Sequence, residues 1–204
     1  MSKDAIALGI AGMFFGLLVG WIIGSQQGSG AAPPAAAQAP AAASSGTAQS
    51  APPPLDESRA AALKSTAQQN PRDAAVRVQL GNMYFDAERF PEAVEWYQNA
   101  LKVNPKDVNA STDLGIAYYY MNQPDRALEQ FDYSLKIDPA HAKTLLNQGI
   151  VRAFGRQDLS GAQQSWERVL QVAPRSEEAV RAKQALDGIR SAHQGVDSGS
   201  GTGR

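Results

Sequence analysis

The sequence predicts an all-α protein, an α-solenoid of about three helical-hairpin repeats with flanking helices, preceded by an N-terminal transmembrane helix. Three observations predict it. Residues 5–24 form an uncharged apolar run. Dipeptides ending in proline recur from residue 70 onward at spacings of 34, 34 and 35 residues. Between them, apolar residues follow helical spacing, which indicates stacked amphipathic helices.

The composition excludes several classes of function. Among 204 residues, 19 Lys and Arg oppose 20 Asp and Glu, so the chain lacks the positive excess of a general nucleic-acid binder. Without cysteine it has no disulfides, thiolate nucleophiles or Cys-ligated metals. Nucleotide-binding and zinc-protease motifs are absent, and we expect His141 to be a surface residue. We therefore expect no enzyme, no metal site, no cofactor and no nucleic-acid partner.

The apolar run within residues 1–24 predicts a membrane anchor. A helix over residues 5–24 would be about 30 Å long, which matches the hydrocarbon core of a bilayer. Trp21 lies near its end, as an interfacial aromatic residue does. The alternative is a cleaved signal peptide. Lys3 favours a cytoplasmic N-terminus. We therefore expect a single-pass protein, its repeats in the periplasm if the membrane is a bacterial inner membrane.

Glycines recur at every fourth position within this run, and on a helix they would share one stripe. Such a stripe favours close helix packing, through self-association into a homo-oligomer or docking onto another membrane helix. The alternative is that glycine is common in membrane helices. The four residues are Gly12, Gly16, Gly20 and Gly24.

Two segments are predicted to be disordered. Residues 25–54 are rich in Ala and Pro and carry no charge, so they cannot bury enough apolar surface to offset the entropy of ordering. We interpret them as a flexible linker. Residues 193–204 are rich in Gly and Ser and are predicted to form a disordered tail.

The repeat shows in several positions at once. Leu80-Gly81 is followed by Tyr84, and Leu114-Gly115 likewise by Tyr118. Small and aromatic residues then recur further along each unit: Ala93, Tyr97 and Ala100, then Ala127, Phe131 and Ser134, then Ala162 and Trp166 after Gly149. The proline dipeptides that close the units are Asn70-Pro71, Asn104-Pro105, Asp138-Pro139 and Ala173-Pro174.

This pattern resembles the tetratricopeptide repeat (TPR), a 34-residue pair of antiparallel helices. The resemblance gives repeats at 74–107, 108–141 and 142–175, with flanking helices at 55–69 and 176–190, in a domain spanning 55–192. The third unit departs from the family. Gln148 and Arg152 replace the usual leucine and tyrosine, and we expect one inserted residue in the loop 156–161.

The resemblance implies a concave groove that binds peptides. The first helix of each unit would line it, with Tyr119, Tyr120 and Phe154 alternatively packing inside as core residues. Carried over position by position, the groove residues are Val78, Asn82, Phe85, Asp86, Asn109, Thr112, Asp113, Ile116, Tyr119, Tyr120, Lys143, Leu146, Asn147, Ile150 and Phe154.

One subtype of the family grips acidic C-terminal tails of chaperones with Lys, Asn, Asn, Lys and Arg. Those positions here hold Val78, Asn82, Asp113, Lys143 and Asn147. Because Asp113 would repel a carboxylate, we predict that the chain does not bind such tails.

Together these features predict a membrane-tethered scaffold or adaptor that binds a protein or peptide partner in the groove, in envelope assembly or the organisation of protein complexes. One alternative is a self-associating structural membrane protein without a specific peptide ligand. Another is a secreted soluble repeat protein, which a mature N-terminus within residues 25–45 would support.

Replacing Gly16 and Gly20 by Leu distinguishes the membrane-tethered scaffold from the self-associating structural protein. If the glycine stripe drives assembly, the double variant loses the oligomers that chemical crosslinking detects in the membrane fraction. If the protein is an adaptor, the variant still captures its partner. Loss of capture together with loss of oligomers would favour the self-associating structural protein.

Overall fold

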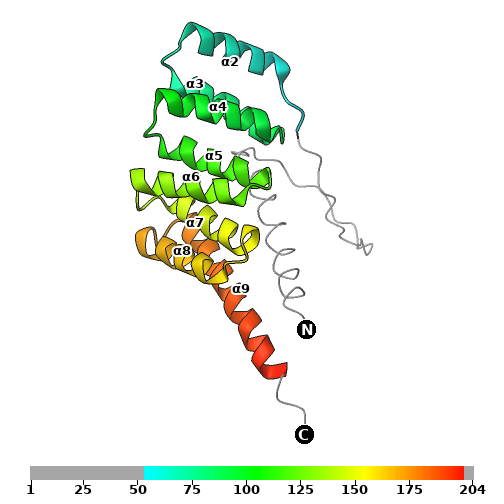
Figure 1. Ribbon diagram of the computed structural model, residues 1–204, viewed down its shortest axis with the longest axis vertical. Helices are drawn as coiled ribbons and strands as arrows, with labels where there is room; N and C mark the ends of the chain where they lie inside the picture. The colour runs from blue at the N-terminus through cyan, green and yellow to red at the C-terminus, as the bar shows by residue number, and fades with distance from the viewer. Residues whose placement is uncertain (1–52, 200–204) are drawn as a thin grey trace, which may run out of the picture.

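Helices stack one above another along the chain in the computed structural model, which describes residues 53–199 (Figure 1). All regular structure in this range is helical, with no strand. The elements are α2 (Glu57–Gln69), α3 (Ala74–Asp86), α4 (Phe90–Val103), α5 (Val108–Tyr120), α6 (Pro124–Ile137), α7 (Ala142–Ile150), the π-helical turn η1 (Val151–Gly155), α8 (Leu159–Val172) and α9 (Glu177–Gly199).

Three hairpins form the centre of the stack: α3 with α4, α5 with α6, and α7 with α8. Helix α4 also packs on α5, and α6 on α7, so each unit rests on the next. The N-caps Asp73 and Asp107 accept backbone N–H bonds at the start of α3 and α5. Pro91 and Pro124 lie in the first turns of α4 and α6, where a missing N–H leaves no bond unmade. The predicted repeat is therefore confirmed as pairs of helices.

A glycine faces an aromatic ring in every hairpin. A Cβ atom added to Gly81 would lie 2.5 Å from Cε1 of Tyr97, and one added to Gly115 would lie 2.5 Å from Cε1 of Phe131. Gly149 lies against Trp166 in the same way. All three rings are at most 2% exposed. The three glycines therefore allow close contact between the two helices of each hairpin.

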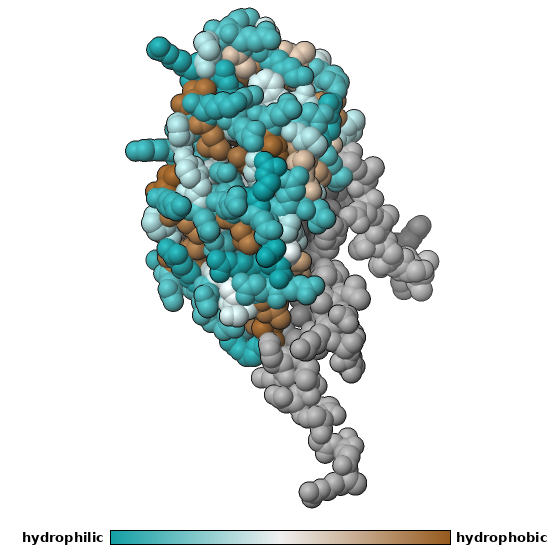
Figure 2. Space-filling view, in the orientation of Figure 1, coloured by the Kyte–Doolittle hydropathy of each residue, from teal (hydrophilic) through white to brown (hydrophobic). Residues whose placement is uncertain are grey.

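The hydrophobic core consists of two clusters that meet in the second and third units. One extends from α2 to α6 and includes Val151 of η1, and the other extends from α7 to α9. Tyr119 packs against both clusters, and it thereby joins the two halves of the stack. Figure 2 shows one face of the stack, where hydrophilic side chains predominate and hydrophobic ones lie between them. The large apolar side chains exposed within the described range are Tyr133, Leu159, Val172 and Val180.

The extra residue of the third unit lies inside a helix. Glu88, Asn122 and Gln157 have positive φ angles and mark the equivalent turn in each hairpin. Gln157 is one residue further from its unit's glycine than the other two, so the insertion precedes the turn. It is absorbed as the π-helical turn Val151–Gly155, because a π-turn accommodates one more residue than an α-turn. The prediction of an insertion in the loop 156–161 was wrong.

The polar replacement Gln148 is buried with its hydrogen bonds satisfied. Its amide donates to Asp132 Oδ1 at 2.8 Å, and its oxygen accepts from Ser165 at 3.0 Å. A buried amide is tolerated when both ends are bonded. The third unit therefore keeps its fold without the usual leucine.

Helix α2 caps one end of the stack through arginine side chains. Arg77 donates to the carbonyl oxygens of Ala67 at 3.2 Å and Asn70 at 3.4 Å, at the end of α2. Arg89 pairs with Glu57 at 3.2 Å. The Arg77 bonds satisfy carbonyls that a helix C-terminus otherwise leaves unpaired, and the Arg89 pair binds the first residue of α2.

Helix α9 caps the other end. Ser176 accepts from Ala179 N at 3.1 Å and thereby caps the start of the helix. The helix continues to Gly199, beyond the predicted end at residue 190 and into the segment 193–204 that was predicted to be a disordered tail. No proline follows residue 190, and Ala192 and Gln194 favour helix, so the helix has no stop signal there.

The predicted anchor at 5–24, with its glycine stripe, and most of the linker at 25–54 lie outside the described residues. Across residues 53–199, no helix combines the length and the apolar character needed to cross a bilayer.

Replacing Gly115 by Ala should lower the free energy of unfolding by about 1–3 kcal/mol, because the new methyl group overlaps the Phe131 ring. Urea denaturation followed by circular dichroism measures it. In a Phe131→Leu background the same change should cost less, because the ring edge is gone. Equal costs in both backgrounds would show that the ring does not set the requirement for glycine.

Candidate functional site

The first helices of the three units carry a connected set of side chains, which we call the α3–α5–α7 face. It comprises Asn82, Phe85, Asp86, Asn109, Asp113, Ile116, Tyr119, Tyr120, Lys143 and Asn147, all exposed or half-buried.

Aromatic rings connect α3 to α5 on this face. Phe85 at the end of α3 and Tyr120 at the end of α5 meet edge to face, with ring centroids 5.3 Å apart. Phe90, the first residue of α4, stacks on Tyr120 at 4.9 Å and lies 5.3 Å from Phe85. All three rings are half-buried. We call them the ring cluster, an apolar anchoring surface open to solvent.

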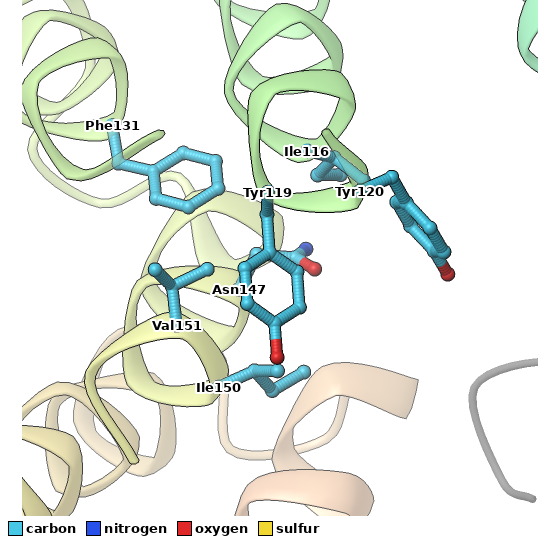
Figure 3. A pocket seen from close by; sticks show the side chains of 7 residues that line it. All are labelled: Ile116, Tyr119, Tyr120, Phe131, Asn147, Ile150 and Val151. Carbon is cyan, nitrogen blue, oxygen red and sulfur yellow. The ribbon is translucent and has the colours of Figure 1, made fainter. Parts of the chain in front are cut away.

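A small pocket lies between α5 and α7 (Figure 3). In Figure 3 the Tyr119 side chain extends toward Ile150, whereas Tyr120 points away from the other labelled side chains. At about 20 Å³ the pocket holds little more than one water-sized group. It is therefore a shallow depression that fits a methyl or methylene group of a ligand. Its lining residues are Ile116, Tyr119, Tyr120, Phe131, Asn147, Ile150 and Val151.

Gly155 of the π-helical turn shapes this region. A Cβ atom there would lie 2.8 Å from Pro124 Cβ and 3.2 Å from Tyr119 Cε2. The absence of a side chain thus lets the turn approach the start of α6 and the Tyr119 ring. Burial raises the pKa of both Tyr119 and Tyr120, so their hydroxyls stay protonated and neutral near pH 7.

The charges of the face are unequal. Asp113 on α5 pairs with Lys143 on α7 at 2.5 Å, so this lysine is already neutralised. Asp86 on α3 is half-buried, and within residues 53–199 it has no hydrogen bond or ion pair. Burial and then the charge of Asp113 raise the pKa of Asp86. One carboxylate of the face therefore lacks a counter-charge.

The amide side chains are partly engaged and partly available. Asn82 Oδ1 accepts from Tyr97 at 2.8 Å, which leaves its N–H donors free. Asn147 donates to the Lys143 carbonyl at 2.8 Å, which leaves its oxygen free. Together the two amides offer a donor and an acceptor, the pair that a peptide group requires.

His141 is not the simple surface residue that the sequence predicted. It is half-buried at the start of α7, where Nδ1 lies 2.7 Å from Thr144 Oγ1 and Nε2 lies 3.1 Å from Asn109 Oδ1. Thr144 in turn bonds Thr112 at 2.6 Å. Burial lowers the pKa of His141, so the ring is neutral near pH 7. This network fixes α5 against α7.

The structure changes part of the predicted groove. Thr112 is 0% exposed, since its hydroxyl is used between α5 and α7, and Leu146 and Ile150 are only 5% and 8% exposed. These three positions are therefore buried between the helices. Of the remaining predicted groove residues, Asn82 and Asn109 are exposed. The others are half-buried: Val78, Phe85, Asp86, Asp113, Ile116, Tyr119, Tyr120, Lys143, Asn147 and Phe154.

Phe90 was missed, because the groove was assigned from first helices only. It directly precedes Pro91, where the second unit has Gln123 before Pro124. An aromatic residue in place of a polar one was the available signal.

In the described part of the chain, no three His, Asp or Glu side chains gather as metal ligands. The α3–α5–α7 face instead presents aromatic rings, side-chain amides and carboxylates.

Comparison with known proteins supports the repeat assignment. A family model described as "TPR repeat" matches residues 81–122, and one described as "Tetratricopeptide repeat" matches residues 112–153. No curated protein matches the sequence.

Solved structures share the fold. The crystal structure of MamA is 18% identical with a TM-score of 0.60, over 69% of this chain and 78% of that one. The first TPR domain of Spaghetti (RPAP3), bound to the HSP90 peptide SRMEEVD, is 25% identical with a TM-score of 0.53, over 61% and 93%. The second TPR domain of human RPAP3, in complex with the HSP70 peptide SGPTIEEVD, is 20% identical with a TM-score of 0.51, over 58% and 98%. Residues 81–153 are thus supported as tetratricopeptide repeats.

Lowering the pH should destabilise the chain through His141. Its folded pKa is depressed, so below its ordinary value of about 6.5 the unfolded chain takes up a proton that the folded chain does not. Stability is therefore complete above that value and falls as the pH falls. Relative to His141→Asn, the free energy of unfolding of the wild type should decrease from pH 8 to pH 5 in urea denaturation. Parallel profiles would contradict this role.

Proposed function

We propose that this tetratricopeptide repeat protein is a membrane-tethered scaffold, which binds an extended peptide segment of a partner protein on the α3–α5–α7 face. The main observation behind this proposal is that the face carries both the ring cluster and the side-chain amides of Asn82 and Asn147. Each of these amides keeps an unused hydrogen-bond donor or acceptor. Half-buried aromatic rings anchor apolar side chains, and paired amide groups bind a peptide backbone.

Structural neighbours that carry peptides support the interaction role. The two RPAP3-type domains hold peptides that end in Glu-Glu-Val-Asp. On the present face Asp113 pairs with the lysine that an acidic tail would need, and Asp86 adds a second carboxylate. The proposed ligand is therefore a peptide of different charge from those.

The tether rests on the sequence. Residues 5–24 supply the length of a transmembrane helix, and residues 25–54 supply an uncharged linker of Ala and Pro. A domain held in this way stays near the membrane yet can reorient toward a partner. A bacterial envelope, with the repeats in the periplasm, is the setting we propose, in the assembly or organisation of a protein complex.

A random 12-residue peptide library displayed on phage, panned on the full chain in a non-ionic detergent, tests the binding face. Replacing Ile116 and Tyr120 by Ser should lower the affinity of the selected peptides by about tenfold or more, because both apolar anchors are lost. Fluorescence polarisation with synthetic copies of the peptides measures the change.

The matched control replaces Tyr133 and Leu159 by Ser. These are also one aromatic and one aliphatic residue, but they are exposed on the second helices α6 and α8. This variant should bind as the wild type does. Selection of no peptide, or equal loss of affinity in both variants, would refute the proposed face.

A further inference from the structure

We propose that the peptide bound on the α3–α5–α7 face carries a Lys or Arg side chain that pairs with Asp86, next to an apolar residue seated on the ring cluster. This inference rests on the proposed function and specifies the chemistry of its ligand. Four observations carry it. Asp86 has no partner among the described residues, and the ring cluster begins at the neighbouring Phe85. Asp113 adds a second carboxylate, and the basic side chains near α3 bind other groups.

Asp86 is the carboxylate of the face that has no partner. Its side chain lies at the end of α3, half-buried, and no described residue gives this side chain a hydrogen bond or an ion pair. The other carboxylate of the face, Asp113, is bound by Lys143 at 2.5 Å. A cation brought by a ligand therefore has one open partner here, and an anion finds no unpaired lysine to bind.

The surroundings of Asp86 strengthen a pair with a cation. The carboxylate is half-buried, so its charge is incompletely solvated, and burial together with the charge of Asp113 raises the pKa of Asp86. Both carboxylates also contribute, after burial, to the raised pKa of Tyr97. A bound ammonium or guanidinium group would relieve this concentration of negative charge.

The ring cluster suits the rest of a basic side chain bound at Asp86. One of its rings, Phe85, directly precedes Asp86 at the end of α3, and Phe90 and Tyr120 complete the cluster. The methylene stem of Lys or Arg packs along aromatic surface while its charged end reaches a carboxylate, and a cation also interacts favourably with ring faces. An apolar neighbour in the peptide then covers the remaining ring surface.

The other basic side chains near α3 are engaged elsewhere. Arg89 pairs with Glu92 and Glu57 and lies over the Tyr84 ring, and Arg77 binds backbone carbonyls. Lys64 also lies over the Tyr84 ring, at 5.3 Å from its centroid. The nearby Glu88 adds negative charge, since it contributes to the raised pKa of Tyr120. The approach to Asp86 is therefore negative.

The peptide selection described above also tests the charge. Peptides selected on the full chain should be enriched in Lys and Arg and depleted in Asp and Glu relative to the unselected library. The tightest basic peptide should bind Asp86→Asn about tenfold more weakly at low salt, because one charge-assisted bond is lost. The control Glu129→Gln removes the same charge from an exposed position on α6 and should stay within about twofold of the wild type.

A double-mutant cycle locates the contact. Replacing the basic residue of the peptide by Gln should weaken binding to the wild type but add little to the loss caused by Asp86→Asn. Peptides without basic enrichment, additive losses, or low-micromolar binding of a peptide ending in Glu-Glu-Val-Asp would overturn the inference and leave the binding face standing. Recovery of no peptide would overturn the proposed function itself, and this inference with it.

Discussion

The whole stack depends on a contact between a glycine and an aromatic ring, made once in each hairpin. Gly81, Gly115 and Gly149 leave room for Tyr97, Phe131 and Trp166, and without that room the two helices of a unit could not bury the ring. The ring in turn fills the space between helices that would otherwise be a cavity, and packed interiors tolerate neither overlap nor voids. In each unit, the two helices are thus held together by one aromatic ring packed against one glycine.

Closing the hairpins in this way leaves the outer surface of α3, α5 and α7 available. Further bonds then fix neighbouring units: Thr112, Thr144 and His141 join α5 to α7, and the Tyr119 ring joins the two core clusters. Because these residues serve packing, the side chains beside them are held in defined positions. Rigid support of this kind reduces the entropy lost when a flexible peptide binds.

The electrostatic character of the face depends on the ion pair between Asp113 and Lys143. Asp113 stands where a peptide-clamping domain has an amide, and it takes Lys143 into an ion pair at 2.5 Å. The lysine is thereby paired within the domain, whereas the Asp86 side chain has no partner among the described residues. A change of side chains on a surface can alter its charge while the fold stays the same.

The sequence by itself determined the repeat, its 34-residue period, the helix pairs and the small and aromatic positions, because these follow from local spacing and from residues that only one packing satisfies. It also indicated most of the exposed face. Only the tertiary structure decided which face residues are core, as with Thr112 and Ile150, since burial depends on how closely neighbouring helices approach. It also decided that the extra residue enters a π-helical turn, that α9 continues to Gly199, and that Phe90 from a second helix joins the ring cluster. Those outcomes depend on contacts between units, which no single repeat encodes.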